Sequence, residues 1–275
     1  NKDLLIVTDN LGKIYALNLK SGEILWTKNH TSVVISQIKI DNDKFYIVDS
    51  ENDINCFSLK NGERIWLFKT EYDLIKSQKK LSIVYDNEKV YFNNSKGDIF
   101  ALDKTNGNLV WLTPTMTNVE SLQSFLIKSS ELILDQDSLF FSNDNNSFYS
   151  LDVNTGFINW TQNISSELNP VISENMIFSI STDGYLFVIE KTSGTVVRST
   201  SILTRSKTKK ISMSGFVAGL NNIYLSLSNG KILKINISNG KLSDIFKISR
   251  GKISSPFINN GKMFIVKSDG IIKLN

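Results

Sequence analysis

The chain has 275 residues, of which 41% are hydrophobic, and a formal net charge of +4. This composition is sufficient for a continuous core, and so small and dispersed a charge gives no indication of nucleic-acid binding. No run of 18 apolar residues is present, so no transmembrane helix is predicted. A single cysteine, Cys56, excludes an internal disulfide, and a single histidine, His30, leaves little room for metal or acid–base chemistry.

One cassette recurs along the chain. Each copy begins with a turn Gly or Asn, continues as a short strand and reaches a second Gly ten residues later; the copies are Gly12–Gly22, Asn52–Gly62, Gly97–Gly107, Asn146–Gly156, Gly184–Gly194 and Gly230–Gly240. In the first four copies a Trp follows the second Gly after four residues, at Trp26, Trp66, Trp111 and Trp160. Self-similarity of this kind is typical of repeat architectures.

In chain order, the first expected strand covers residues 3–8 and takes the second position of a sheet that lacks its innermost strand. The third copy predicts strands at 81–84, 89–93, 99–102 and 109–111. Gly97 supplies the turn between the middle two, and Asp103 is expected to cap the turn that follows. Later strands are expected at 176–181, 185–189, 223–227, 231–235 and 262–267, with Pro170 and Pro256 at strand starts. The last expected strand, from Gly270 onward, has no outer partner.

Four short antiparallel strands per repeat, with no helices between repeats, predict an all-β fold, a β-propeller of four-stranded blades. A β-sandwich is the alternative, but sandwiches do not repeat one cassette. Seven blades are visible, or eight if an N-terminal blade is missing, and residues 1–275 are expected to form a single propeller domain. Because the chain starts at Asn1 without a charged-then-apolar leader, we expect that a targeting segment has been removed.

The tryptophans have two interpretations: a set that stacks on a ligand, or residues that close each blade against the next. Their regular recurrence favours packing, and the same applies to the glycines of the repeat, Gly22, Gly62, Gly107, Gly156, Gly194 and Gly240. The fifth and sixth copies carry Arg198 and Asp244 in the Trp position, so different packing is expected there. Cys56 takes the place of Ala16 in its repeat and is predicted to be a small buried residue rather than a nucleophile. His30 is expected in a loop.

Three segments depart from the repeat, and inserted loops are where repeat scaffolds carry function. Residues 112–130 contain a capping-box pattern from Thr117 and predict a short helix, either a partner contact or a packed connector. Residues 198–210 are basic, including Arg205, Lys207 and Lys209, and could face anionic lipid or simply be solvated. Residues 69–80 contain no pattern that indicates a particular function.

The cassette Gly-x-Ile-x-Ala-Leu-Asp-x-x-x-Gly-x-x-x-Trp resembles the pyrroloquinoline-quinone-type repeat over essentially the whole chain. Two families use this repeat: quinoprotein dehydrogenases, and BamB, the propeller lipoprotein of the bacterial outer-membrane β-barrel assembly machinery. The chain is similar to BamB in size and in its ending, Ser255-Pro256-Phe257-Ile258 followed by Asp269-Gly270-Ile271. The resemblance therefore implies a non-enzymatic scaffold without a cofactor, periplasmic and associated with the outer membrane through an N-terminal lipid anchor outside this chain.

The same resemblance implies a partner. BamB-like proteins bind the periplasmic domains of the barrel-assembly protein BamA through a loop motif, Leu-Asp-Leu-Arg-Ser-Gly. By position this motif best matches Leu102-Asp103-Lys104-Thr105-Asn106-Gly107, which makes Leu102, Lys104 and Thr105 the predicted partner-binding residues. Leu17-Asn18-Leu19-Lys20-Ser21-Gly22 is closer in letters but lies in an earlier blade.

The alternative is a small quinone-dependent dehydrogenase. Quinoprotein alcohol dehydrogenases are much longer, and many stack the quinone on a ring of two adjacent cysteines. This chain has one cysteine, and no motif matches the Glu, Asn and Asp of their Ca²⁺ site. The resemblance to BamB is therefore the preferred interpretation.

Overall fold

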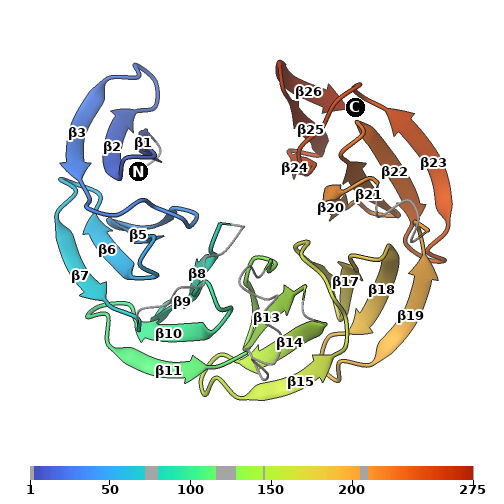
Figure 1. The fold of residues 1–275 in the computed structure, drawn as a ribbon, viewed down its shortest axis with the longest axis horizontal. Coiled ribbons are helices and arrows are strands. Elements are labelled where there is room, and N and C mark those ends of the chain that lie inside the picture. Colours follow the sequence, from blue (N-terminus) through green and yellow to red (C-terminus); the bar gives the residue numbers. More distant parts are fainter. Residues whose placement is uncertain (1–2, 72–79, 116–127, 145, 205–209, 275) are drawn as a thin grey trace. The chain divides into compact units, whose positions relative to one another are not determined.

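The computed structural model describes residues 3–71, 80–115, 128–144, 146–204 and 210–274. Within these ranges the regular structure is entirely β, arranged as seven antiparallel sheets of three or four strands whose order follows the chain (Figure 1). None of the described residues belongs to a helix capable of crossing a membrane. The predicted all-β architecture of four-stranded repeats is confirmed.

The strands of sheets 1 to 4 follow one another in sequence. Sheet 1 contains β1 (Leu4–Thr8), β2 (Lys13–Asn18) and β3 (Ile24–Asn29). Sheet 2 contains β4 (Lys39–Asp41), β5 (Lys44–Val48), β6 (Ile54–Ser58) and β7 (Arg64–Phe68). Sheet 3 contains β8 (Ile83–Tyr85), β9 (Lys89–Asn93), β10 (Ile99–Asp103) and β11 (Leu109–Thr113). Sheet 4 contains β12 (Ile133–Asp135), β13 (Ser138–Asn143), β14 (Ser147–Asp152) and β15 (Ile158–Gln162).

The remaining sheets repeat the pattern. Sheet 5 contains β16 (Val171–Ser173), β17 (Met176–Ile180), β18 (Tyr185–Glu190) and β19 (Val196–Ser201). Sheet 6 contains β20 (Met213–Ala218), β21 (Asn222–Leu227), β22 (Lys231–Asn236) and β23 (Leu242–Lys247). Sheet 7 contains β24 (Phe257–Asn259), β25 (Lys262–Lys267) and β26 (Gly270–Leu274). The first and last sheets have three strands each, as predicted.

The chain divides into two compact units, and the division falls within sheet 4. Unit 1 is Asn1–Phe140 with Leu151–Ile158, and unit 2 is Phe141–Ser150 with Asn159–Asn275. The single-domain organisation expected for residues 1–275 stays a prediction.

The turn residues at the start of each cassette have the backbone conformation that the sequence predicts. Gly97 has a φ of +90°, which suits a residue without a Cβ atom. Asn52 takes the equivalent place in sheet 2 with a φ of +66°, in the region that Asn tolerates better than most residues. The alternation of Gly and Asn at this position therefore reflects one conformational requirement.

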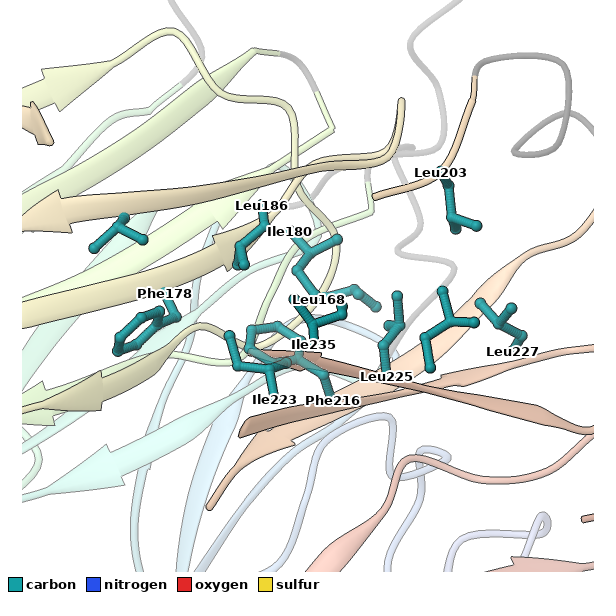
Figure 2. Close-up of a cluster of buried hydrophobic side chains, with 12 residues drawn as sticks. Leu168, Phe178, Ile180, Leu186, Leu203, Phe216, Ile223, Leu225, Leu227 and Ile235 are labelled. Carbon is teal, nitrogen blue, oxygen red and sulfur yellow. The ribbon is translucent and has the colours of Figure 1, made fainter. Parts of the chain in front are cut away.

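Each unit has its own apolar core between neighbouring sheets. In unit 1, Tyr46, Ile54, Phe92 and Leu102 belong to one cluster of buried side chains from sheets 2 and 3. In unit 2, Phe178 and Ile180 of β17 lie among buried side chains that include Ile223 and Leu225 of β21 (Figure 2). Burial of such side chains, at about 1.5–3 kcal/mol each, is the main force that holds adjacent sheets together.

Most strand positions are confirmed to within a residue or two, and one needs correction. The strand expected at 81–84 begins at Ile83, because the backbone of Leu81 is bonded elsewhere. Its N–H donates to the Ile35 carbonyl at 2.9 Å and its carbonyl accepts from Gln37 N–H at 3.1 Å. The helix predicted from Thr117 lies outside the described residues, as do Arg205, Lys207 and Lys209 of the basic segment.

Candidate functional site

Each cassette ends in a turn that contains its second Gly and leads into the outermost strand of the sheet. These turns, here called the repeat turns, hold one sheet to the next. The indole N–H of Trp66 donates to the Lys104 carbonyl at 3.3 Å, and that of Trp111 donates to the Val153 carbonyl at 2.9 Å. Trp26 and Trp160 make the same bond, to the carbonyls of Leu59 and Lys191 at 3.1 and 3.0 Å. Each of the four indoles therefore links its sheet to the repeat turn of the next sheet.

In four of the six cassettes the second Gly makes room for that indole. A Cβ atom added at Gly107 would lie 2.7 Å from Trp66 Cδ2, and one at Gly156 would lie 2.6 Å from Trp111 Cδ2. The glycines Gly62 and Gly194 stand in the same relation to Trp26 and Trp160. These glycines are thus required both by their positive φ and by the close approach of the ring.

The residue that pairs with a Trp on the neighbouring strand of the same sheet is also small. Cys56 pairs in register with Trp66, as Ala16 does with Trp26. Cys56 is completely buried, and burial raises the pKa of its thiol to about 12. A thiol in this state is not a nucleophile at neutral pH, so the prediction of a structural cysteine is confirmed.

Arg198 replaces Trp in sheet 5 and makes an equivalent link by different chemistry. Its guanidinium donates to the carbonyls of Ile237 and Ser238 in the repeat turn of sheet 6. In that turn, a Cβ atom on Gly240 would meet the Thr200 side chain, with Oγ1 at 2.5 Å. Asp244, in the Trp position of sheet 6, is exposed.

The first repeat turn has no neighbour of this kind among the described residues, which contain no sheet before sheet 1. No atom of the described residues lies within 4 Å of a Cβ built on Gly22, and Leu19 is 57% exposed. Its neighbour Lys20 is exposed and pairs with Asp3 at 3.0 Å. This turn, whose letters match the family motif well, therefore presents an apolar and a basic side chain to solvent.

The three predicted partner-binding residues lie together at the end of β10 but in different environments. Leu102 is completely buried in the core of unit 1 and has no surface to offer a partner. Thr105 is exposed at the tip of the turn, and its hydroxyl donates to the Asp103 carboxylate. That bond and the Thr105 backbone N–H hold the pKa of Asp103 below its usual value. Asp103 thus caps the turn and fixes the position of Thr105.

Lys104 has an intramolecular role that the sequence did not indicate. Its ammonium pairs with the Asp41 carboxylate of sheet 2 at 2.9 Å and donates to the Asp86 carbonyl at 2.8 Å. It also lies 5.4 Å from the centre of the Tyr85 ring, and Tyr85 donates its hydroxyl to the Ile40 carbonyl at 2.7 Å. With its side chain only 16% exposed, Lys104 links sheets 2 and 3.

A second buried polar contact between sheets was also missed. His30 lies at the end of β3, and its Nε2 is 3.0 Å from an Asp49 carboxylate oxygen of sheet 2. Asp49 also accepts from the Asn55 amide and from the backbone N–H of Glu51 and Asp53. His30 does lie outside the strands, as predicted, but its side chain is only 7% exposed. No sequence pattern predicts either the Lys104–Asp41 pair or the His30–Asp49 pair, because the two partners of each come from different repeats.

Seven antiparallel sheets in chain order, six of which carry the cassette and the first five of which are joined by Trp–Gly contacts, define a β-propeller of the pyrroloquinoline-quinone repeat class. The sequence matches the family described as outer membrane protein assembly factor BamB over residues 1–200. The chain belongs to the BamB family.

Comparison with solved structures shows the same fold. BamB from Moraxella catarrhalis superposes with a TM-score of 0.83 and 17% identity, over 98% of this chain and 81% of that one. A quinohemoprotein alcohol dehydrogenase from Pseudomonas putida superposes with a TM-score of 0.76 and 11% identity, over 98% of this chain and 63% of that one. No curated protein sequence matches the chain. At these identities the structural matches establish the fold, and the family assignment comes from the sequence match.

Proposed function

We propose that the protein is a non-enzymatic scaffold of the outer-membrane β-barrel assembly machinery and binds the periplasmic domains of the barrel-assembly protein BamA. The observation that carries this proposal is the BamB family match over residues 1–200. The proposal includes a periplasmic location at the outer membrane, with a lipid anchor on a segment N-terminal to this chain.

The third repeat turn, between β10 and β11, supplies the contact surface in this proposal. Thr105 is exposed on a turn that Asp103 caps and Trp66 covers, so a partner would meet a rigid tip rather than a flexible loop. Leu102 and Lys104 contribute by holding that tip, through core packing and through the Asp41 ion pair.

Co-isolation tests this proposal. The tagged protein, expressed in a bacterium with its assembly machinery intact and extracted in native detergent, should recover the barrel-assembly protein. Thr105→Arg should reduce recovery, because a long charged side chain at the tip disrupts packing against a partner. Ser238→Arg is the matched control, since Ser238 takes the equivalent position in the sixth repeat turn and also donates its hydroxyl to the capping residue. If the unsubstituted protein recovers no barrel-assembly protein, the proposal is wrong.

The second candidate is a small quinone-dependent dehydrogenase, which the superposition on quinohemoprotein alcohol dehydrogenase favours. That likeness is one of fold, and the single buried Cys56 cannot form the adjacent pair on which many such enzymes stack the quinone. Dye-linked oxidation of alcohols or sugars after addition of quinone and Ca²⁺ distinguishes the two. The scaffold proposal predicts no turnover above the rate without protein.

A further inference from the structure

A basic pocket lies in unit 1 between the end of β3 and the start of β7. It has a volume of about 480 Å³ and is lined by Lys28, Asn29, His30, Thr31, Phe57, Glu63 and Arg64. Lys28 and Arg64 are exposed, and neither forms an ion pair with another described residue. We call this pocket the basic groove.

His30 is held firmly in the wall of the basic groove. Its Nε2 faces Asp49 at 3.0 Å, and its ring meets Phe57 edge-on with centroids 5.8 Å apart. With Nε2 engaged by Asp49 and its side chain only 7% exposed, His30 forms part of the wall of the basic groove and is not among the groups proposed to donate to the ligand. Asp49 is itself satisfied by the Asn55 amide and two backbone N–H groups, so its carboxylate is already saturated by the protein.

Comparison among the repeats shows that basic residues occur at these positions in only one groove. The basic groove combines the residues two and four positions after one Trp with the residue two positions before the next, here Lys28, His30 and Arg64. In the following repeats the same three positions hold Phe68, Thr70 and Leu109, then Thr113, Thr115 and Ile158, then Gln162, Ile164 and Val196, then Thr200, Ile202 and Leu242. None of these is charged, so the fold does not require the basic residues of the first set.

We propose that the basic groove binds carboxylate side chains of an acidic protein segment. The Arg64 guanidinium offers a planar pair of donors that matches a carboxylate, and Lys28 adds a second positive charge, so the two cations outnumber the one carboxylate of the lining, that of Glu63. Asn29 and Thr31 supply polar side chains, and Phe57 gives the groove an apolar wall against which a ligand's methylene groups can pack. This site goes beyond the proposed function and does not depend on which protein the repeat turns bind.

His30 is the only histidine in the chain, so its imidazole provides a single NMR signal from within the groove. The test titrates the protein, labelled with ¹⁵N and ¹³C at histidine, with an end-blocked peptide of four glutamates at low salt. We expect a saturable shift of the imidazole resonances. Arg64→Gln and Lys28→Gln should each weaken binding by about tenfold or more, the usual effect of losing one charge-assisted bond. Lys60→Gln is the control: it also removes one positive charge, from the exposed turn between β6 and β7 of sheet 2. It should leave the affinity for the peptide within about twofold.

Three results would overturn the proposal. One is the absence of a saturable shift in the unsubstituted protein, and another is equal weakening by Lys60→Gln and Arg64→Gln. The third concerns the source of the oxyanion: if inorganic phosphate saturates the shift and the glutamate peptide does not, the groove is a phosphate site. A peptide of four glutamines should cause no shift, and unchanged amide spectra of the free variants would establish that each remains folded.

Discussion

Two glycines in equivalent positions offer a sharp test of the contact between sheets. Gly22 and Gly156 each end a repeat turn, and both have a φ of +72°. A Cβ atom on Gly156 would lie 2.6 Å from Trp111 Cδ2 and 2.9 Å from Thr113 Oγ1, whereas one on Gly22 would meet nothing within 4 Å. Substitution by alanine therefore imposes the same backbone penalty at both sites and a steric clash at only one.

The magnitudes follow from these two terms. Alanine at a positive φ costs about 1–2 kcal/mol, and this applies to Gly22→Ala and Gly156→Ala alike. At Gly156 the added methyl group must also push Trp111 away from the turn, and overpacking of this kind costs about 1–3 kcal/mol more. Displacement of the ring also strains the 2.9 Å bond to the Val153 carbonyl. We therefore expect Gly156→Ala to lower the free energy of unfolding by about 1–3 kcal/mol more than Gly22→Ala does.

The assay is equilibrium unfolding in urea, followed by far-UV circular dichroism and by tryptophan fluorescence. The comparison holds where the two probes coincide and the denaturant slopes of the variants agree. A blue or red shift of native-state fluorescence in Gly156→Ala alone would report movement of the indole. Equal destabilisation by the two substitutions would refute the argument that the ring, rather than the backbone, requires glycine.

Four further outcomes follow from the structure. Arg198→Met leaves two backbone carbonyls without their donor and should lower the free energy of unfolding by about 1–3 kcal/mol, measured in urea. Lys104→Met leaves the Asp41 carboxylate unpaired, which should cost about 3–5 kcal/mol; adding Asp41→Asn should restore part of it in a double-mutant cycle. Hydrogen bonds from the Ser193 side chain and backbone lower the pKa of Glu190 from 4.5 to about 2. Its stabilising effect is therefore present above pH 4.5 and lost as the pH falls toward 2, so Glu190→Gln should show a weaker decline in thermal stability across that range. Finally, Cys56 should resist a thiol reagent at pH 8 in the folded protein and react at once in urea, because its pKa is about 12; rapid labelling of the native state would contradict its burial.

The repeat made most of the fold predictable from sequence. Turn residues such as Gly97 are dictated by local backbone conformation, and the partner of each indole recurs with the cassette, so a periodic pattern reports both. The sequence also showed that Arg198 breaks the pattern, although not that its guanidinium would replace the indole link.

What the sequence could not predict are pairs between different repeats. Lys104 meets Asp41, and His30 meets Asp49, only because neighbouring sheets pack in a particular register. No spacing along the chain encodes such a contact. The same limitation affected Leu81, whose backbone is bonded to residues 35–37 and not to β9. The predicted contact residues show the consequence for function: Leu102 matches the family motif by letter, yet it lies in the core.

The central claim is that a protein partner binds the tip of the third repeat turn, at Thr105. The most direct measurement is the affinity of the purified chain for the purified periplasmic domains of the barrel-assembly protein, by isothermal titration calorimetry. The account predicts saturable binding that Thr105→Arg weakens and that Ser238→Arg leaves unchanged. Absence of binding by the folded, unsubstituted chain, or equal weakening by both substitutions, would contradict it.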